Sequence, residues 1–303
     1  MTFLLSNEVA MAVAAGGAVV GLETSVIGQG LPYPRNLECI ERMETAIRDA
    51  EAVPGWIGVA GGAVRVGLER SELERFATPA AAIKVARRDV PVAVASGSLG
   101  ATTVSAAIWA AHRAGIGVVA TGGIGGVHPG PRPDVSADLF ELARTPIVLI
   151  ASGPKSIVDP GATAEKLEEL GVVLVGYGVD RLPFFLAREA PVELEHRVDT
   201  PDGAAAIARA HRSLGVEAAI VLGNPIGSEH ALDRDELMAA TARAETRMTE
   251  AGVAGKEVTP FLLRALAEET DGRSLEANLV LLEDNARLAA EVAVAISAAR
   301  SER

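Results

Sequence analysis

Lys155 occupies a position that an ordinary solvent-exposed lysine does not require. The segment IVLIASGPKSIVDPG (147–161) runs from an apolar stretch into a Gly-Pro turn, and the lysine follows this turn directly. A lysine in water has a pKa of about 10.4, so its amine is protonated at neutral pH and is not a nucleophile. Desolvation or a neighbouring cation would free such an amine for Schiff-base chemistry with a carbonyl carbon. The alternative is an ordinary surface lysine.

The segment ATGGIGGVHPG (120–130) is a glycine-rich loop. Backbone amides in such a loop can approach an anion closely, so the segment is consistent with a phosphate site as well as with a structural turn. It does not align with G-x-G-x-x-G, and the sequence contains no G-x-x-x-x-G-K-[ST] motif. His128, inside the loop, is the histidine with the most suggestive position. The histidines show no metalloprotease pairing.

Two carboxylates lie four residues apart in PDVSADLFEL (133–142). A helix that begins here would place Asp134 and Asp138 on one side, where they could share a hard divalent cation with water. In the alternative interpretation, Asp134 or Ser136 is the N-cap of the helix and Asp138 complements the helix dipole. The spacing alone leaves both interpretations open.

The segment IKVARRDVP (83–91) concentrates basic residues in an otherwise acidic chain. Lys84, Arg87 and Arg88 could form a solvated charge run, which is the common case. A compact basic patch is also what a phosphate ester requires.

Short apolar runs that are typical of β-strands alternate with helical patterns along most of the chain. The strand candidates are residues 18–23, 56–61, 90–96, 117–123, 146–152, 172–178 and 218–224. The helix candidates are residues 37–51, 102–114, 136–143, 163–170 and 204–214, and only helices are expected from residue 233 onward. This rhythm predicts an α/β fold with a largely parallel sheet covered by helices on both faces. No linker or repeat divides the chain, so we expect one domain over residues 1–303.

The candidate functional residues follow the expected strands. Glu23 ends the first run, the glycine-rich loop follows the run at 117–123, and Lys155 follows the run at 146–152. In open α/β sheets, ligands bind beyond the carboxyl ends of the strands. The sequence therefore places these residues where a ligand site is expected.

Composition excludes several classes of protein. The 303 residues are 49 % hydrophobic but only 3 % aromatic, with a net charge of −12, which argues against a nucleic acid as partner. The single cysteine, Cys39, excludes an internal disulfide framework and a thiolate zinc site, and we expect it in the core. The apolar run at residues 10–22 is shorter than the roughly 20 residues of a membrane helix, and no Lys or Arg precedes Arg35. We therefore expect a soluble cytoplasmic protein without a membrane partner.

Taken together, these segments resemble the pseudouridine-5'-phosphate glycosidases, also called the indigoidine synthase A-like family. The similarity covers nearly the whole chain in the family's order, at residues 21–38, 84–91, 100–107, 120–128, 134–142, 152–159, 224–226, 255–263 and 274–293. The chain departs from the usual pattern where Pro129 replaces a common arginine and Gln29 a frequent histidine, and the segment between Gly130 and Asp134 is short. These departures bear on phosphate affinity and on the identity of the substrate.

The resemblance implies a three-layer α/β/α sandwich with a largely parallel or mixed sheet, a homotrimer and one bound Mn²⁺. It also implies reversible cleavage of pseudouridine 5'-phosphate to uracil and ribose 5-phosphate, in nucleotide catabolism. Carried over by motif, Glu23 is the proton donor, Lys155 the nucleophile and Asp134 the metal ligand. The expected substrate contacts are Lys84, Val104, His128, Ser136, Ala137, Asp138 and Asn278.

The bond that this reaction breaks explains the need for a lysine. Pseudouridine joins ribose C1' to uracil C5 through a carbon–carbon bond, so protonation of a base heteroatom is not enough. An iminium formed by Lys155 at C1' would supply a nitrogen cation, and Glu23 could move protons to the ring oxygen and to C5. Two alternatives stay open: the same site acting on another C-glycoside or sugar phosphate, and a non-catalytic phosphosugar-binding protein.

Overall fold

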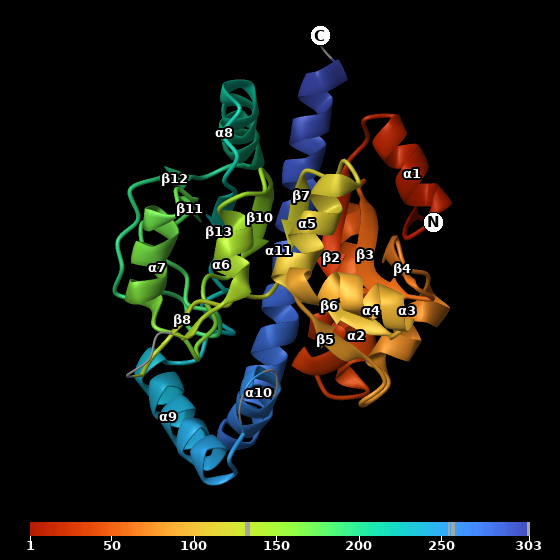
Figure 1. The fold of residues 1–303 in the computed structure, drawn as a ribbon. Helices are drawn as coiled ribbons and strands as arrows, with labels where there is room; N and C mark the ends of the chain where they lie inside the picture. Colours follow the sequence, from red (N-terminus) through yellow and green to blue (C-terminus); the bar gives the residue numbers. More distant parts are fainter. Residues whose placement is uncertain (131–133, 254, 256–257, 302–303) are drawn as a thin grey trace.

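A mixed sheet with a parallel centre forms the middle of the molecule (Figure 1). The computed structural model describes residues 1–130, 134–253, 255 and 258–301. The parallel neighbours are, in spatial order, β3 (Val53–Ala60), β2 (Val19–Glu23), β7 (Val118–Ala120), β10 (Val148–Ala151), β13 (Ile220–Gly223), β11 (Val173–Tyr177) and β12 (Arg197–Val198). This arrangement confirms the predicted largely parallel or mixed sheet.

Antiparallel pairing is confined to one side of the sheet. There β4 (Ala63–Val66) and β6 (Gly100–Thr102) each run antiparallel to β3. Beyond them, β1 (Phe3–Leu5) pairs with β4 and β5 (Ile83–Val85) with β6, both in parallel. None of these four short strands was predicted from the sequence.

Helices cover both faces of the sheet, which confirms the three-layer α/β/α sandwich. One layer contains α2 (Arg35–Asp49), α8 (Pro201–Leu214) and α11 (Arg273–Ser301); the other contains α1 (Asn7–Ala14), α5 (Val104–Arg113), α6 (Ala137–Leu142) and α7 (Pro160–Glu169). Strand β2 serves both cores, because its side chains alternate. Val20 and Leu22 pack with the α2 and α11 layer, and Val19 packs with the α5 layer.

The strand predicted at residues 90–96 is wrong, because this run forms helix α4 (Val90–Ser96). Pro91 lies in the first turn, where a missing N–H costs nothing, and Gly97 ends the helix in the left-handed conformation with φ +66°. A short apolar run alone cannot distinguish a strand from such a helix. Here the flanking Pro and Gly identify the helix.

Helices α9 (Arg234–Glu250) and α10 (Val258–Glu269) form a hairpin that extends beyond the body (Figure 1). A small core joins it to the segment after Lys155: Leu262 and Ala265 of α10 pack with Ile157 and Val158. The hairpin therefore lies at the end of the sheet where the candidate site was expected. Of the described helices, none is both long and apolar enough to cross a membrane.

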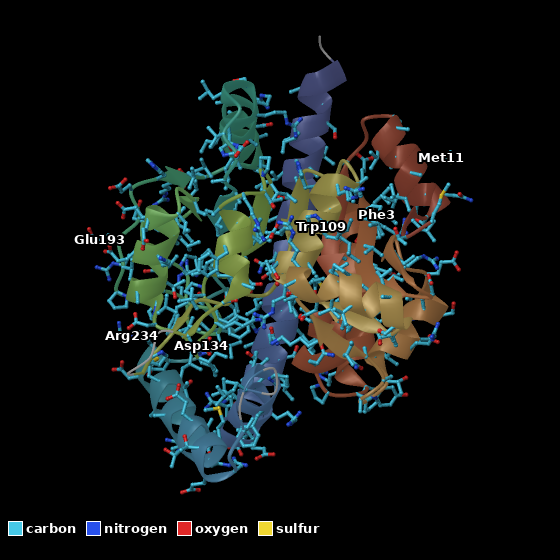
Figure 2. All side chains as sticks on the ribbon, viewed as in Figure 1. Phe3, Met11, Trp109, Asp134, Glu193 and Arg234 are labelled. Carbon is cyan, nitrogen blue, oxygen red and sulfur yellow. The ribbon has the colours of Figure 1, made fainter. Side chains whose placement is uncertain are left out.

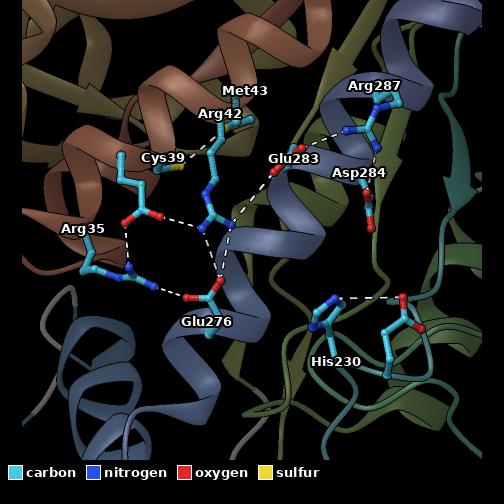
Figure 3. Close-up of polar contacts among 11 residues, drawn as sticks. Arg35, Cys39, Arg42, Met43, His230, Glu276, Glu283, Asp284 and Arg287 are labelled. Carbon is cyan, nitrogen blue, oxygen red and sulfur yellow. Dashed lines mark hydrogen bonds and ion pairs between the residues drawn. The ribbon is translucent and has the colours of Figure 1, made fainter.

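Ion pairs align α11 against α2 (Figure 3). Arg42 of α2 reaches Glu38 at 2.6 Å, Glu276 at 3.3 Å and Glu283 at 3.9 Å, and Arg35 also pairs with Glu276. A single exposed ion pair contributes little to the free energy of folding. Together these pairs form a network that fixes the register of α11 against α2. On the same helix α2, Cys39 is buried, as expected, and burial raises the pKa of its thiol.

Candidate active site

A cavity of about 320 Å³ lies beyond the carboxyl ends of β2, β7 and β10. The residues that line it come from segments spread over the chain, from the end of β2 to helix α11. They include every site residue proposed from the sequence: Glu23, Lys84, Val104, His128, Asp134, Ser136, Ala137, Asp138, Lys155 and Asn278. The structure thus brings these residues together, while their roles stay proposals.

Glu23 is a buried carboxyl group at the end of β2, only 2 % exposed. Thr121, just after β7, donates a hydrogen bond of 2.5 Å from its hydroxyl to Oε1, and Ser25 donates one of 2.6 Å to Oε2. Burial raises the pKa of Glu23, while the positive charge of Lys155 and the two hydroxyl donors oppose this rise. Glu23 is therefore suited to hold a proton at higher pH than an ordinary glutamate.

Lys155 is half-buried and fixed by the backbone around it. The backbone N–H of Lys155 donates to the carbonyl of Ile124 at 3.0 Å, and the backbone N–H of Ile124 donates to the carbonyl of Gly153 at 3.1 Å. The segment after β10 is thereby joined to the glycine-rich loop after β7. The Gly-Pro turn therefore presents the lysine to the cavity that Glu23 also lines.

Gly153 is a position where only glycine fits. Its φ is +81°, and a Cβ atom there would lie 1.8 Å from the carbonyl oxygen of Pro183. We expect Gly153→Ala to lower the free energy of unfolding by at least about 3 kcal/mol, measured by urea denaturation. The matched control is Gly178→Ala, where φ is +68° but no atom lies within 4 Å of the added Cβ. That control should cost only about 1 kcal/mol, and equal losses for the two variants would contradict the steric explanation.

The glycine-rich loop packs closely against helix α6. The N–H of Gly125 donates to Asp138 Oδ2 at 3.0 Å, and a Cβ at Gly125 would lie 2.2 Å from the hydroxyl oxygen of Ser136. Asp138 Oδ1 accepts from the N–H of Ser105 at 3.0 Å. The buried carboxylate of Asp138 thus joins the loop to the start of α5. Gly125 thus allows the loop to pack closely on α6. Gly122, Gly123 and Gly125 also line the cavity.

Of the two interpretations left open for Asp134 and Asp138, the structure supports the helix N-cap at Ser136 and not two carboxylates on one helix face. Helix α6 begins at Ala137, with the Ser136 side chain as its N-cap, whereas Asp134 lies in strand β9 (Asp134–Val135). Asp134 is exposed and pairs in register with His128 of strand β8 (Val127–His128). Figure 2 shows Asp134 at the end of the body nearest the α9–α10 hairpin. Residues 131–133, in the short segment noted above, lie outside the described residues.

A cation at Asp134 would have to be bound largely by water or substrate. Among the residues that the structure describes, no group of three or more His, Cys, Asp or Glu side chains could enclose a metal ion. Both oxygens of Asp138 already accept backbone N–H groups. Asp134 could supply one carboxylate ligand, which is how hydrated Mg²⁺-like ions are often bound.

The basic segment at residues 83–91, which begins with β5, divides between two environments. Lys84 and Arg88 line the cavity. Arg87 instead donates to both oxygens of the buried Glu141, at 2.7 and 2.8 Å, and its guanidinium lies 5.8 Å from the ring centre of Trp109. Arg87 is therefore not part of a solvated charge run, and a phosphate site at Lys84 and Arg88 stays a prediction.

His128 lies in the cavity wall and is more than half-buried. Burial lowers its pKa, although the nearby carboxylate of Asp134 opposes this shift. The positive charges of Lys84 and Lys155 lower the pKa further. At neutral pH the ring is therefore uncharged and can both donate and accept a hydrogen bond.

Several lining residues were not predicted from the sequence. Ser25, Thr103 and Thr121 lie close to the carboxyl ends of β2, β6 and β7, and this position after a strand is the signal that could have found them. Gln29, one of the departures noted above, also lines the cavity, and its Nε2 donates to the carbonyl of Ala82 at 2.9 Å. Phe185 comes from a distant loop that no local pattern identifies, whereas Pro260 of α10 lies in the family segment 255–263 but was not singled out.

Removal of the Thr121 hydroxyl should raise the pKa of Glu23 further. Thr121→Val keeps the shape of the side chain but deletes the donor to Oε1, which lowers the pKa in the wild-type protein. The titration can be followed by the carboxyl infrared band that Glu23→Gln removes. Thr145→Val is the control, because Thr145 is also buried but donates to Glu141. A Glu23 pKa that is unchanged or lower in Thr121→Val would contradict the assignment.

Comparison with known proteins identifies the family of this chain. The family model described as indigoidine synthase A-like protein matches residues 8–295, which include every site residue discussed above. The chain belongs to the indigoidine synthase A-like family. The resemblance inferred from the sequence motifs is therefore confirmed.

Relatives match the chain over nearly its whole length. The pseudouridine-5'-phosphate glycosidase of Symbiobacterium thermophilum is 45 % identical over 308 residues, covering 99 % of this chain and 100 % of that protein. The pseudouridine-5'-phosphate glycosidase of Herpetosiphon aurantiacus is 48 % identical over 295 residues, covering 97 % of each.

Solved structures share the fold just described. The prealnumycin C-glycosynthase AlnA, in complex with ribulose 5-phosphate, superposes with a TM-score of 0.91 at 40 % identity, covering 100 % of this chain and 99 % of that one. An indigoidine synthase A-like protein from Thermotoga maritima gives a TM-score of 0.90 at 38 % identity, with 98 % and 97 % covered.

Proposed function

We propose that this protein is an enzyme that cleaves the carbon–carbon glycosidic bond of pseudouridine 5'-phosphate, giving uracil and ribose 5-phosphate. One observation carries the proposal: a buried carboxyl group, Glu23, and a fixed lysine, Lys155, line the same cavity at the carboxyl ends of the strands. Full-length relatives at 45 and 48 % identity are named pseudouridine-5'-phosphate glycosidases. A solved relative at 40 % identity holds a pentose 5-phosphate.

The first step forms a bond between the Lys155 nitrogen and ribose C1'. Once Lys155 has lost its proton, its amine attacks C1', the bond from C1' to the ring oxygen breaks, and Glu23 delivers its proton to that oxygen and then takes the proton that the attacking nitrogen releases. The ribose is then open and covalently attached to Lys155. Lys155 is half-buried and its backbone is fixed by hydrogen bonds, so the residue is pre-positioned for this attack, which lowers the entropic cost.

The second step breaks the bond between C1' and uracil C5. The nitrogen lone pair forms an iminium with C1', while C5 keeps the electrons of the broken bond and receives from Glu23 the proton that the nitrogen released in the first step. Uracil leaves. Water then adds to the iminium carbon, and Lys155 departs as an amine to give ribose 5-phosphate. Overall one water is consumed.

The remaining lining residues would bind the substrate. Lys84 and Arg88 bring positive charge to the cavity wall, where the 5'-phosphate would bind. His128, uncharged at neutral pH, and Asn278 offer hydrogen-bonding groups for the ribose hydroxyls or the base. Val104, Ser136 and Ala137 complete the wall, and Asp138 holds the glycine-rich loop in place.

We further propose that the protein binds one Mn²⁺ and forms a homotrimer, as the family resemblance implies. Asp134 would hold the ion through one carboxylate, with water or substrate oxygens as the other ligands. Such an ion would organise nearby charged groups and neutralise negative charge of the substrate.

A second candidate keeps the same site and changes the substrate. The relative AlnA is a C-glycosynthase bound to ribulose 5-phosphate, so this fold also accommodates another C-glycoside reaction. Gln29 in the cavity wall and Pro129 next to His128 mark where this chain departs from the usual family pattern.

One assay tests the proposed function and separates the candidates. Uracil release from pseudouridine 5'-phosphate is followed by ultraviolet absorbance, with uridine 5'-phosphate as the N-glycoside control and with Mn²⁺ or EDTA added. We expect release from the C-glycoside only, faster with Mn²⁺. Tight substrate binding without release would instead indicate a phosphosugar-binding protein, and turnover of other C-glycosides alone would favour the second candidate.

A further inference from the structure

Asn285 of helix α11 joins the ends of three neighbouring strands behind the cavity. It is completely buried. Its Nδ2 donates to the carbonyl of Thr121 at 2.8 Å, after β7, and to the hydroxyl of Ser152 at 3.0 Å, after β10. Its Oδ1 accepts from Asn224 Nδ2 at 3.0 Å, after β13. One side-chain amide thus contacts the carboxyl ends of β7, β10 and β13.

This amide is fully used in the network. Its two N–H groups have separate acceptors, and its oxygen has a donor, so none of its hydrogen-bonding capacity is left unsatisfied in the core. A buried amide without partners would cost stability. Asn285 also lies seven residues, two helical turns, after the cavity residue Asn278, so the two share one face of α11.

Both reacting groups are connected to this amide. Thr121, held through its carbonyl by Asn285, donates its hydroxyl to Glu23. Ser152, held through its hydroxyl, donates its N–H to the carbonyl of Gly122 at 2.8 Å and precedes Lys155 by three residues. The distance between the acid and the amine therefore depends on the two segments that Asn285 joins.

We propose that Asn285 is a positioning residue of the active site, which fixes the Thr121 and Ser152 segments relative to each other and thereby places Glu23 against Lys155. It does not line the cavity, so it acts through these segments and not on the substrate. The expected effect of Asn285 on catalysis rests on the proposed function. Whether Asn285 joins the two segments can be measured separately, by amide hydrogen exchange without turnover.

The test uses Asn285→Asp, which keeps the shape but places a carboxylate oxygen against the carbonyl of Thr121. Asn285→Ala, which removes the donors without adding charge, is the second variant if the first does not fold. The control is Thr270→Val: Thr270 is buried and accepts from the N–H of Ser274, but it does not line the cavity. Rates are expressed per folded protein.

We expect Asn285→Asp to lower kcat for uracil release about 10- to 100-fold, with less than about a threefold change in KM. The limb of the pH profile controlled by Glu23 should move to higher pH, because the Thr121 hydrogen bond that lowers the Glu23 pKa is weakened. Amide hydrogen exchange in residues 121–124 and in Ser152, Gly153 and Lys155 should become at least about tenfold faster. Thr270→Val should show none of these changes.

Unchanged hydrogen exchange in both segments would overturn the proposal, whatever the activity. So would a kcat and pH profile equal to those of the control in an otherwise active enzyme, since Asn285 would then be purely structural. A wild-type protein that releases no uracil, with faster exchange in the variant, would instead overturn the proposed function alone.

Discussion

Replacement of Lys155 by alanine should abolish turnover of pseudouridine 5'-phosphate. The variant loses the only atom proposed to bond to C1', so we expect uracil release to fall on the order of 10⁴-fold or more, measured by ultraviolet absorbance. The fold should persist, because the described hydrogen bonds of residue 155 are made by its backbone.

Lys166→Ala is the matched control for this loss. Lys166 lies on α7, where its ammonium pairs with Glu169 at 2.9 Å, and it does not line the cavity. Its removal should leave the rate unchanged within about twofold. If Lys155→Ala kept a substantial fraction of wild-type activity, a covalent role for this amine would be excluded.

Glu23→Gln should give the second-largest loss. Glutamine keeps the size of the side chain but cannot deliver the proton, so we expect kcat to fall about 10²- to 10⁴-fold. Because Glu23 acts as an acid, wild-type activity should decline as pH rises through its pKa, which burial raises above that of an ordinary glutamate. This decline should disappear from the residual activity of Glu23→Gln.

Glu44→Gln controls for the loss of a carboxyl group as such. Burial also raises the pKa of Glu44, which accepts from Trp56 Nε1 at 3.0 Å, but Glu44 lies outside the cavity. Its replacement should affect stability more than the pH profile. A Glu23→Gln variant with the rate and pH dependence of Glu44→Gln would show that Glu23 is not the acid.

The site could be predicted from the sequence because parallel strands bring their carboxyl ends to one edge. Glu23, the glycine-rich loop and Lys155 each follow an apolar run, and the family motifs added the residues between them. The prediction of secondary structure failed where a local apolar pattern fits both a strand and a helix. The run at residues 90–96 is apolar enough for a strand, but Pro91 and Gly97 delimit a helix.

Some of the missed structure had a usable signal. Gly61 and Gly62, with φ of +59° and +73°, form the two-residue turn between β3 and β4, and a Gly-Gly pair between apolar runs is typical of such hairpins. Other features had none. Asn285 lies 164 residues from its partner Thr121, and only the packing of α11 on the sheet brings them together.

The covalent bond between Lys155 and the sugar is the claim that a single measurement tests most directly. The protein is incubated with ribose 5-phosphate and cyanoborohydride and is then digested. The mass of each lysine-containing peptide is measured by mass spectrometry. We expect the reduced pentose phosphate on Lys155 and not on Lys166, with no trapping in Lys155→Ala. Modification of other lysines at the same rate, or none at Lys155 in an active enzyme, would contradict the Schiff-base mechanism.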